Sequence, residues 1–553
     1  MRRKKDNKRV LRRGNGNNNK RNRRTPHVSI KDRHINSNRN NRVRKEKKRS
    51  GKTVLLMILV LVAFIVGAGA GILLSFDDGT SDQNETHYEN VTVEMTTNLN
   101  ESNNVIFEEE DHVDFNENQS SAILDADKNP YYNKKDETHW FIYVIFMDYI
   151  INLDGGFSVI ENLKVSGARE GKFGVSIIVC PNSTASGVFT SNKVVAAPVR
   201  YTKDVLKNGI VSAVFVNSGN ANCFTGEQGF KDCETLVELV SQDLKIPKEE
   251  IAISSTGVIG REMPIDTISK VAYESLSKLG NGPENSLAAA KAIMTTDTFP
   301  KECAVEVTLT TGEVVKIAGI TKGSGMIAPN MGTMLSFIVT DAIIPANEIN
   351  KALKQAADIS FNMIVVDGDE STNDTCLLMA NGASGVEVVK DGKLDSNFQE
   401  ALNYLCIDLA KKMARDGEGA TKFIEANVCG AKDLNDARLA AKSIISSSLF
   451  KSAVFGGDPN WGRIVSAIGY SGCDLNPDIV TIAIADDADE VDLVKHGEIL
   501  AFEDTPYLER AEKIMQSKNV IVNIDLDLGE AEATAWGCDL TYDYVKINAE
   551  YTT

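Results

Sequence analysis

The uncharged segment at residues 54–76 separates two parts of the chain that differ sharply in charge. Residues 1–52 hold 22 Lys and Arg against 3 Asp and Glu, and almost no apolar residues, so this part carries about +19. The whole chain carries -17, which leaves about -36 on the residues that follow. Because a basic stretch without apolar side chains cannot bury a hydrophobic core, a globular fold must lie after the segment.

The uncharged segment has the length of a membrane-spanning helix. About 20 apolar residues cross the ~30 Å hydrocarbon core of a bilayer, so we expect one transmembrane helix at residues 53–76. Residues 1–52 then form a disordered tail whose positive charge keeps it inside. Such a tail also suits contact with nucleic acid or anionic lipid, but the topology signal explains it, and we expect no nucleic-acid partner. The acidic, polar residues 77–150 predict a disordered linker.

Cysteine and histidine are placed unevenly along the chain. All nine cysteines lie at or after Cys180, without Cys-x-x-Cys spacing, and this favours reduced thiols in a cytoplasmic catalytic region. Of six histidines, only His496 follows residue 140. We expect it on an exposed helix or loop. This distribution disfavours a Ser-His-Asp triad and a histidine-based metal site.

From Gly155 onward the pattern is that of a mixed α/β globular fold. Apolar runs and alternation predict strands at residues 211–217, 335–339, 479–485 and 520–526. Helical spacing predicts helices at residues 234–244, 287–294, 346–359, 397–415 and 434–448.

A glycine-rich stretch at residues 322–341 leads into a threonine at the head of an apolar, strand-like segment. Gly332 can take backbone conformations closed to other residues, which would expose its carbonyl to attack by the Thr333 hydroxyl. Cleavage there would leave Thr333 with a free α-amine, which titrates near pH ~8 and can serve as the base for its own hydroxyl. Taken alone, the same residues also fit an ordinary surface turn.

Several blocks along the chain together resemble the ornithine acetyltransferase family, the bifunctional glutamate N-acetyltransferase/amino-acid acetyltransferases of arginine biosynthesis. The resemblance covers about residues 155–553. It lies in the blocks at residues 217–223, 255–260, 294–298, 322–341, 366–369, 371–374, 457–463 and 547–553. The family most often has alanine before the cleaved bond, whereas this chain has Gly332.

The resemblance implies a fold and a reaction. The fold would be a layered α/β/β/α-type sandwich like that of N-terminal-nucleophile enzymes, cut between Gly332 and Thr333 into an α chain (151–332) and a β chain (333–553). Thr333 would take acetyl from N2-acetyl-L-ornithine and pass it to L-glutamate. The α and β chains would associate as a heterotetramer or a higher oligomer.

The resemblance also implies the residues of the site. Thr256 and Gly257 would form the oxyanion hole, where a hydroxyl and a backbone N–H donate together. The substrate-binding positions would be Thr296, Lys322, Thr333, Glu418, Asn548 and Thr553. Lys322 would pair with the substrate carboxylate and Glu418 with the ornithine ammonium. Read locally, Ser-Thr-Gly at 255–257 is a turn and Glu418 is a solvated loop carboxylate.

Other chemistry finds less support. Asp367 and Asp369 invite a hard cation, but no EF-hand spacing accompanies them, and we expect a structural turn and no metal. The chain has no Walker or GxGxxG loop, so we expect no nucleotide cofactor, with acetyl-CoA as a possible co-substrate.

Two other functions stay open. One is an N-terminal-nucleophile amidohydrolase or aminopeptidase, in which water removes the acyl group. The other is a membrane-anchored binding protein with an inert enzyme-like domain. A basic-inside topology would also place everything after Phe76 outside, while the resembled enzymes use cytosolic metabolites. We therefore interpret residues 1–150 as a fused or misjoined membrane-protein segment. The protein would meet a membrane only through residues 53–76.

Overall fold

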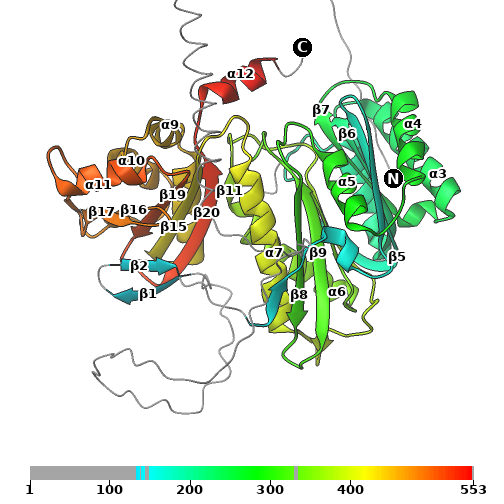
Figure 1. The fold of residues 1–553 in the computed structure, drawn as a ribbon, viewed down its shortest axis with the longest axis horizontal. Coiled ribbons are helices and arrows are strands. Elements are labelled where there is room, and N and C mark those ends of the chain that lie inside the picture. Colours follow the sequence, from blue (N-terminus) through cyan, green and yellow to red (C-terminus); the bar gives the residue numbers. More distant parts are fainter. Residues whose placement is uncertain (1–131, 137–138, 143–147, 329–333, 551–553) are drawn as a thin grey trace, which may run out of the picture. The chain divides into compact units, whose positions relative to one another are not determined.

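The computed structural model describes residues 132–136, 139–142, 148–328 and 334–550 (Figure 1). Outside these lie the expected basic tail, the expected membrane helix, most of the expected linker, and the three predicted site residues Gly332, Thr333 and Thr553. Among the described residues, no helix has both the length and the apolar character that a membrane span requires.

The larger sheet holds the first half of the globular fold. Its strands run in the order β3-β8-β9-β10-β12-β5-β6-β7, with β4 paired to β5. They are β3 (Ile150–Asn152), β4 (Lys164–Glu170), β5 (Phe173–Phe189), β6 (Ile210–Asn220), β7 (Ile251–Val258), β8 (Lys301–Thr308), β9 (Val314–Lys322), β10 (Leu335–Thr340) and β12 (Thr375–Ala380). Strand β10 is antiparallel to β9 and parallel to β12, so the sheet is mixed.

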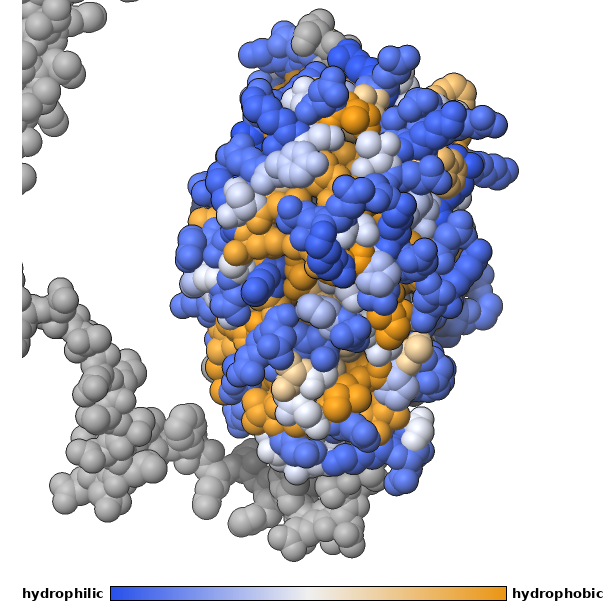
Figure 2. All heavy atoms as spheres, turned by 90° about the vertical axis from the view of Figure 1, so that its right-hand side faces the viewer, coloured by the Kyte–Doolittle hydropathy of each residue, from blue (hydrophilic) through white to orange (hydrophobic). Residues whose placement is uncertain are grey.

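Helices pack on the β5–β7 end of this sheet. They are α2 (Ala197–Val205), α3 (Gly226–Leu244), α4 (Ile265–Leu276) and α5 (Pro283–Ile293). Ile177 and Phe215 pack with α3 and α4, whereas Ile178 and Val214 pack with α5. Adjacent residues of β5 and β6 are thus buried on opposite faces, which explains their continuous apolar sequence. On the face that carries α3 and α4, hydrophilic residues predominate and hydrophobic ones show in bands between them (Figure 2).

The second sheet is also mixed and has the order β11-β20-β15-β19-β16-β17-β18. Its strands are β11 (Ile364–Val365), β15 (Phe423–Ala431), β16 (Thr481–Ala485), β17 (Glu490–Lys495), β18 (Glu498–Ile499), β19 (Asn519–Asp525) and β20 (Ala531–Cys538). The remaining α-helices are α6 (Ala346–Asp358), α7 (Ser396–Arg415), α8 (Leu434–Ser446), α9 (Ser448–Gly456), α10 (Trp461–Gly469), α11 (Pro506–Ile514) and α12 (Tyr542–Glu550).

Short elements complete the described chain. Two antiparallel strand pairs stand apart from the main sheets, β1 (Tyr132–Asp136) with β2 (His139–Ile142) and β13 (Val389–Lys390) with β14 (Lys393–Leu394). The 3-10 helices are η1 (Gly156–Val159), η2 (Leu206–Asn208), η3 (Lys248–Glu250) and η4 (Phe361–Met363).

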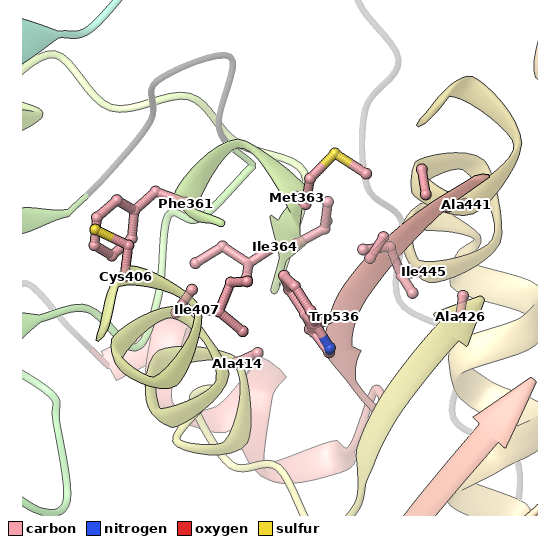
Figure 3. Packing of buried hydrophobic residues seen from close by; sticks show 14 of the residues in the cluster. Phe361, Met363, Ile364, Cys406, Ile407, Ala414, Ala426, Ala441, Ile445 and Trp536 are labelled. Atoms are coloured by element: carbon pink, nitrogen blue, oxygen red, sulfur yellow. The ribbon is translucent and has the colours of Figure 1, made fainter. Parts of the chain in front are cut away.

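Helix α7 connects the two sheets and ends at the functional site. Asp395 caps its start by accepting from the Phe398 N–H at 3.2 Å. One side of the helix contacts β8 and β9, and another contacts β20. In the close-up, Ile407 and Ala414 of α7 lie beside Trp536 of β20 (Figure 3). Burial of each large apolar side chain stabilises this junction by roughly 1.5–3 kcal/mol.

The predicted α/β mixture and each predicted helix and strand are confirmed. The boundaries differ most at α3 (Gly226–Leu244), predicted as residues 234–244, which begins eight residues earlier than predicted. They differ less at β6 (Ile210–Asn220), predicted as residues 211–217. That strand continues through the polar residues Ser218 and Asn220, which are buried. A pattern of apolar residues cannot show this extension, because the residues that extend the strand are polar.

Candidate functional site

Lys322 and Thr256 meet although they lie in separate strands. The Lys322 ammonium donates to the Thr256 hydroxyl oxygen over 3.4 Å, and both side chains are buried. Lys322 is the last residue of β9, and Thr256 lies near the end of β7. Two predicted site residues, 66 positions apart, are therefore brought together.

Gly257 follows Thr256 in a conformation that only glycine adopts easily. Its φ is +136°, and it pairs with Gly219 of β6. A Cβ atom at this position would lie 2.4 Å from the carbonyl carbon of Gly219 and 2.5 Å from the N of Asn220. Both the backbone angle and the close approach of β6 thus require glycine here.

The Lys322 ammonium lies in a buried, mostly acidic environment. Burial is the largest influence on the pKa of Lys322 and lowers it below its ordinary value. The negative charges of Asp297, Asp374 and Glu418 oppose this shift. The positive charge of Lys301 repels the Lys322 ammonium and lowers the pKa of Lys322 further. The site therefore offers a cation surrounded by carboxylates, which suits a substrate that itself carries both charges.

Glu418 is buried rather than solvated, contrary to its local reading. Only 8% of the residue is exposed, and its backbone N–H donates to the Ser324 carbonyl at 3.0 Å. Gly325 lies against its carboxyl group, since a Cβ there would be 2.3 Å from the carboxyl carbon. The Asn548 side chain donates to Glu418 Oε2 over 2.7 Å. The predicted return of the C-terminal residues to the site is seen in this contact from α12.

Thr296 lies half-buried in the turn between α5 and β8. Its neighbour Asp297 links that turn to the end of β9, because Asp297 Oδ1 accepts from the Gly323 N–H at 2.8 Å. Asp297 Oδ2 accepts from the Thr295 N–H at 3.0 Å. The Thr296 turn and the Lys322 turn are thereby joined.

Asp374 is a buried carboxyl group to which the sequence assigned no role. Its Oδ1 accepts from the Met334 N–H at 2.7 Å. Burial raises the pKa of Asp374 well above its ordinary value, although this hydrogen bond and Lys322 act in the opposite direction. Met334 directly follows Thr333, so the beginning of β10 is tied to a buried carboxyl group. The only signal in the sequence was the position of Asp374 in one of the recognised blocks.

Asn373 connects three of the sequence blocks that carry the family resemblance, those at residues 217–223, 255–260 and 371–374. Its side-chain amide donates to the Ala221 carbonyl at 2.6 Å and to the Ser255 carbonyl at 2.9 Å. Ser255 in turn donates through its hydroxyl to Asn217 Oδ1 at 2.6 Å. Segments more than 100 residues apart are thus packed around Thr256.

Two expectations outside this cluster are confirmed. Asp367 forms a structural turn, since its carboxylate accepts from the backbone N–H groups of Met326 at 2.6 Å and Ile327 at 2.9 Å. His496 is exposed, in the turn between β17 and β18.

The gathered groups define a class of protein. A hydroxyl, a buried ammonium and a buried carboxylate in one place, on a mixed α/β fold, fit an acyltransferase that binds a substrate with both charges, such as an amino acid. Comparison with known proteins specifies this class further. The ArgJ family model matches residues 162–553.

Curated relatives cover the same part of the chain. The glutamate N-acetyltransferase of Methanothermobacter thermautotrophicus is 51% identical over 399 residues, which are 72% of this chain and 98% of that protein. The glutamate N-acetyltransferase of Methanosarcina mazei is 51% identical over 402 residues, 72% of this chain and 99% of that protein. The chain belongs to the ArgJ family, and the resemblance to ornithine acetyltransferases is confirmed.

Two solved structures are also similar in sequence. The arginine biosynthesis bifunctional protein argJ from Bacillus halodurans is 45% identical and covers 39% of this chain and 99% of its own, with a TM-score of 0.37. Ornithine acetyltransferase from Mycobacterium tuberculosis, solved with ornithine, is 32% identical and covers 34% of this chain and 99% of its own, with a TM-score of 0.31.

Proposed function

We propose that residues 151–553 form a self-cleaving acetyltransferase that moves acetyl from N2-acetyl-L-ornithine to L-glutamate. The chain is an acyltransferase of the ArgJ family and acts as a glutamate N-acetyltransferase in arginine biosynthesis, the activity for which its curated relatives are named. The observation that carries the proposal for the site is the contact between Lys322 and Thr256, at the centre of the recognised blocks.

Self-cleavage comes first in this proposal. The Thr333 hydroxyl attacks the Gly332 carbonyl carbon, the peptide C–N bond breaks, and the resulting ester is hydrolysed by water. Cleavage of the C–N bond frees the α-amine of Thr333, and hydrolysis of the ester frees its hydroxyl together with the Gly332 carboxylate. The α-amine can then accept the proton of the Thr333 hydroxyl. The anchored Met334 N–H supports the scheme, because it fixes the residue next to the proposed nucleophile.

Acetyl transfer follows in two steps. Thr333 Oγ attacks the acetyl carbonyl of N2-acetyl-L-ornithine, ornithine leaves with a proton, and the glutamate amine then takes the acetyl group from Thr333. The Thr256 hydroxyl and the Gly257 N–H would stabilise the oxyanion of each step. Because Lys322 donates to the Thr256 oxygen, the hydroxyl proton of Thr256 stays available for the oxyanion.

The charged groups would select the amino acid. We propose that Lys322 binds the substrate carboxylate and that Glu418 binds the ornithine ammonium. Asn548 donates to one oxygen of Glu418 and thereby fixes the orientation of the carboxylate. The pocket would be completed by Thr296, Thr333 and Thr553.

The wider organisation is part of the same proposal. The α chain (151–332) and β chain (333–553) would form a layered α/β/β/α-type fold like that of N-terminal-nucleophile enzymes and assemble as a heterotetramer or a higher oligomer. Acetyl-CoA would be a second acetyl donor only in a bifunctional enzyme. The catalytic region would act in the cytoplasm. Because a basic-inside tail (1–52) followed by a membrane helix (53–76) and a linker (77–150) would place it outside, residues 1–150 would be a fused or misjoined segment.

Release of ornithine from N2-acetyl-L-ornithine, measured with and without L-glutamate, tests the reaction. A transferase releases ornithine continuously only when glutamate is present and forms one N-acetylglutamate for each ornithine. Glutamate-independent release at the same rate, with free acetate as product, would instead identify the amidohydrolase alternative.

A further inference from the structure

Lys301 is a fully buried lysine to which the proposed reaction assigns no role. It is the first residue of β8, and its side chain has no exposed surface. Its ammonium donates to Asp297 Oδ1 at 2.7 Å and to Asp416 Oδ2 at 2.5 Å. It also donates to the Phe299 carbonyl at 3.4 Å. A buried ammonium with all its donors used is held in one place.

The first partner, Asp297, holds two of the substrate-binding segments. Its carboxylate also accepts from the backbone N–H groups of Thr295 and Gly323. Thr295 precedes the predicted substrate residue Thr296, and Gly323 follows Lys322. The position of Asp297 therefore sets the distance between these two turns.

The second partner, Asp416, holds the third segment. Its carboxylate accepts from the Thr298 N–H at 3.0 Å, and its backbone carbonyl accepts from the Ser324 hydroxyl at 2.7 Å. The Ser324 carbonyl accepts from the backbone N–H of Glu418, which lies two residues after Asp416. Through Asp416, the Lys301 ammonium is thus linked to the turn that presents Glu418.

We propose that Lys301 is a positioning residue, which sets the spacing of the three segments that bind the amino-acid substrate without touching the substrate. The inference rests on the proposed function. Without the ammonium, Asp297 and Asp416 would be two buried carboxylates in proximity, and they would separate or draw in water. The Thr296, Lys322 and Glu418 positions would then shift relative to one another.

Lys301→Met in the full chain tests this, with Lys278→Met as the matched control. Lys278 also pairs with a carboxylate, Glu274 Oε1 at 2.6 Å, but its side chain is 53% exposed. After mass spectrometry has verified cleavage, kcat and KM are measured for N2-acetyl-L-ornithine and L-glutamate. Because displacement of binding groups by ~1 Å can cost ~10²-fold, Lys301→Met should raise both KM values about tenfold or more. Lys278→Met should leave both unchanged.

A second variant keeps the test decisive if Lys301→Met does not fold. Lys301→Met combined with Asp416→Asn removes a cation and an anion together, a replacement that buried ion pairs often tolerate. We expect this double variant to fold and still to show raised KM values, because its hydrogen bonds to the Thr296 and Glu418 segments are changed.

KM values within twofold of the wild type, in either variant once folded and cleaved, would overturn the inference, whatever the value of kcat. A reduced kcat at unchanged KM would show only a smaller fraction of correctly folded enzyme. If the wild type itself shows no glutamate-dependent transfer, the proposed function fails, and the inference fails with it. The two failures are therefore distinguishable.

Discussion

The backbone N–H of Met334 donates to the Asp374 carboxyl group over 2.7 Å, and so ties the beginning of β10 to the loop before β12. The two strands run parallel from Leu335 and Thr375 onward. The hydrogen bond between Met334 and Asp374 therefore lies where β10 and β12 begin to pair, directly after the proposed cleavage site. This hydrogen bond fixes the chain on the C-terminal side of the Gly332–Thr333 peptide bond that would be cut.

Replacement of Asp374 should therefore slow self-cleavage. Asp374→Ala leaves the Met334 N–H without its partner, which costs about 1–3 kcal/mol and corresponds to a slowing of roughly 5- to 150-fold. Asp374→Asn keeps an acceptor oxygen and should cleave faster than the alanine variant. Gel analysis of freshly purified protein over time measures the rates. Equal cleavage rates in the two variants and the wild type would exclude this role for Asp374.

Replacement of Glu418 should affect one substrate more than the other. Glu418→Gln removes the charge that would hold the ornithine ammonium, and a hydrogen bond to a charged group contributes about 1.5–3 kcal/mol. We expect kcat/KM for N2-acetyl-L-ornithine to fall about 10- to 150-fold. The exposed Glu498→Gln serves as control. Steady-state kinetics that show no selective loss would remove Glu418 from the pocket.

Alanine substitutions at two glycines with positive φ should separate the stability cost of close packing from that of backbone strain. Gly257 (φ +136°) would bring a Cβ within 2.4 Å of Gly219, whereas Gly260 (φ +75°) has no atom within 4 Å of a Cβ. Strained backbone alone costs about 1–3 kcal/mol. We expect Gly260→Ala to lose about this much stability and Gly257→Ala to lose more, together with its activity. Denaturant unfolding compares the two, and equal losses would contradict the close approach of β6.

Acid stability should depend on Asp297. Burial raises the pKa of its carboxyl group, but Lys322 and Lys301 outweigh burial, so the folded-state pKa lies below the ordinary value. A lowered pKa contributes stability above the unfolded value of ~3.9, and this contribution is lost as pH falls through the folded value. The wild type should therefore lose stability below about pH 4 more steeply than Asp297→Asn. Unfolding midpoints measured from pH 6 to pH 3 check this, and parallel curves would count against it.

Part of the site could be predicted from the sequence, but the buried Lys301 could not. Thr256 and Lys322 stand in recognisable blocks, Glu418 is a position that the family resemblance implies, and the structure brings the three together as described. Lys301 has no such mark, because a lysine at the start of a strand is usually solvated. Its burial depends on Asp416, which lies 115 residues away in the chain. Only the folded arrangement shows that pairing.

The fold shows the same division. Helix α7 was predictable because its apolar residues recur at helical spacing. Its contacts with β8 and β9 of one sheet and with β20 of the other were not predictable. The apolar residues of the helix show that it is buried, but they do not show which strands it packs against. Periodicity identifies an element that is buried, but it does not identify what buries it.

The most direct test of the account is the intact mass of the purified wild type beside Thr333→Ala. We predict two wild-type fragments that meet between Gly332 and Thr333, and a single uncut chain for the variant. Such a result would give Thr333 the free α-amine that the mechanism requires. A wild type that remains one chain would contradict the account, because Thr333 would then have no amine to activate its hydroxyl.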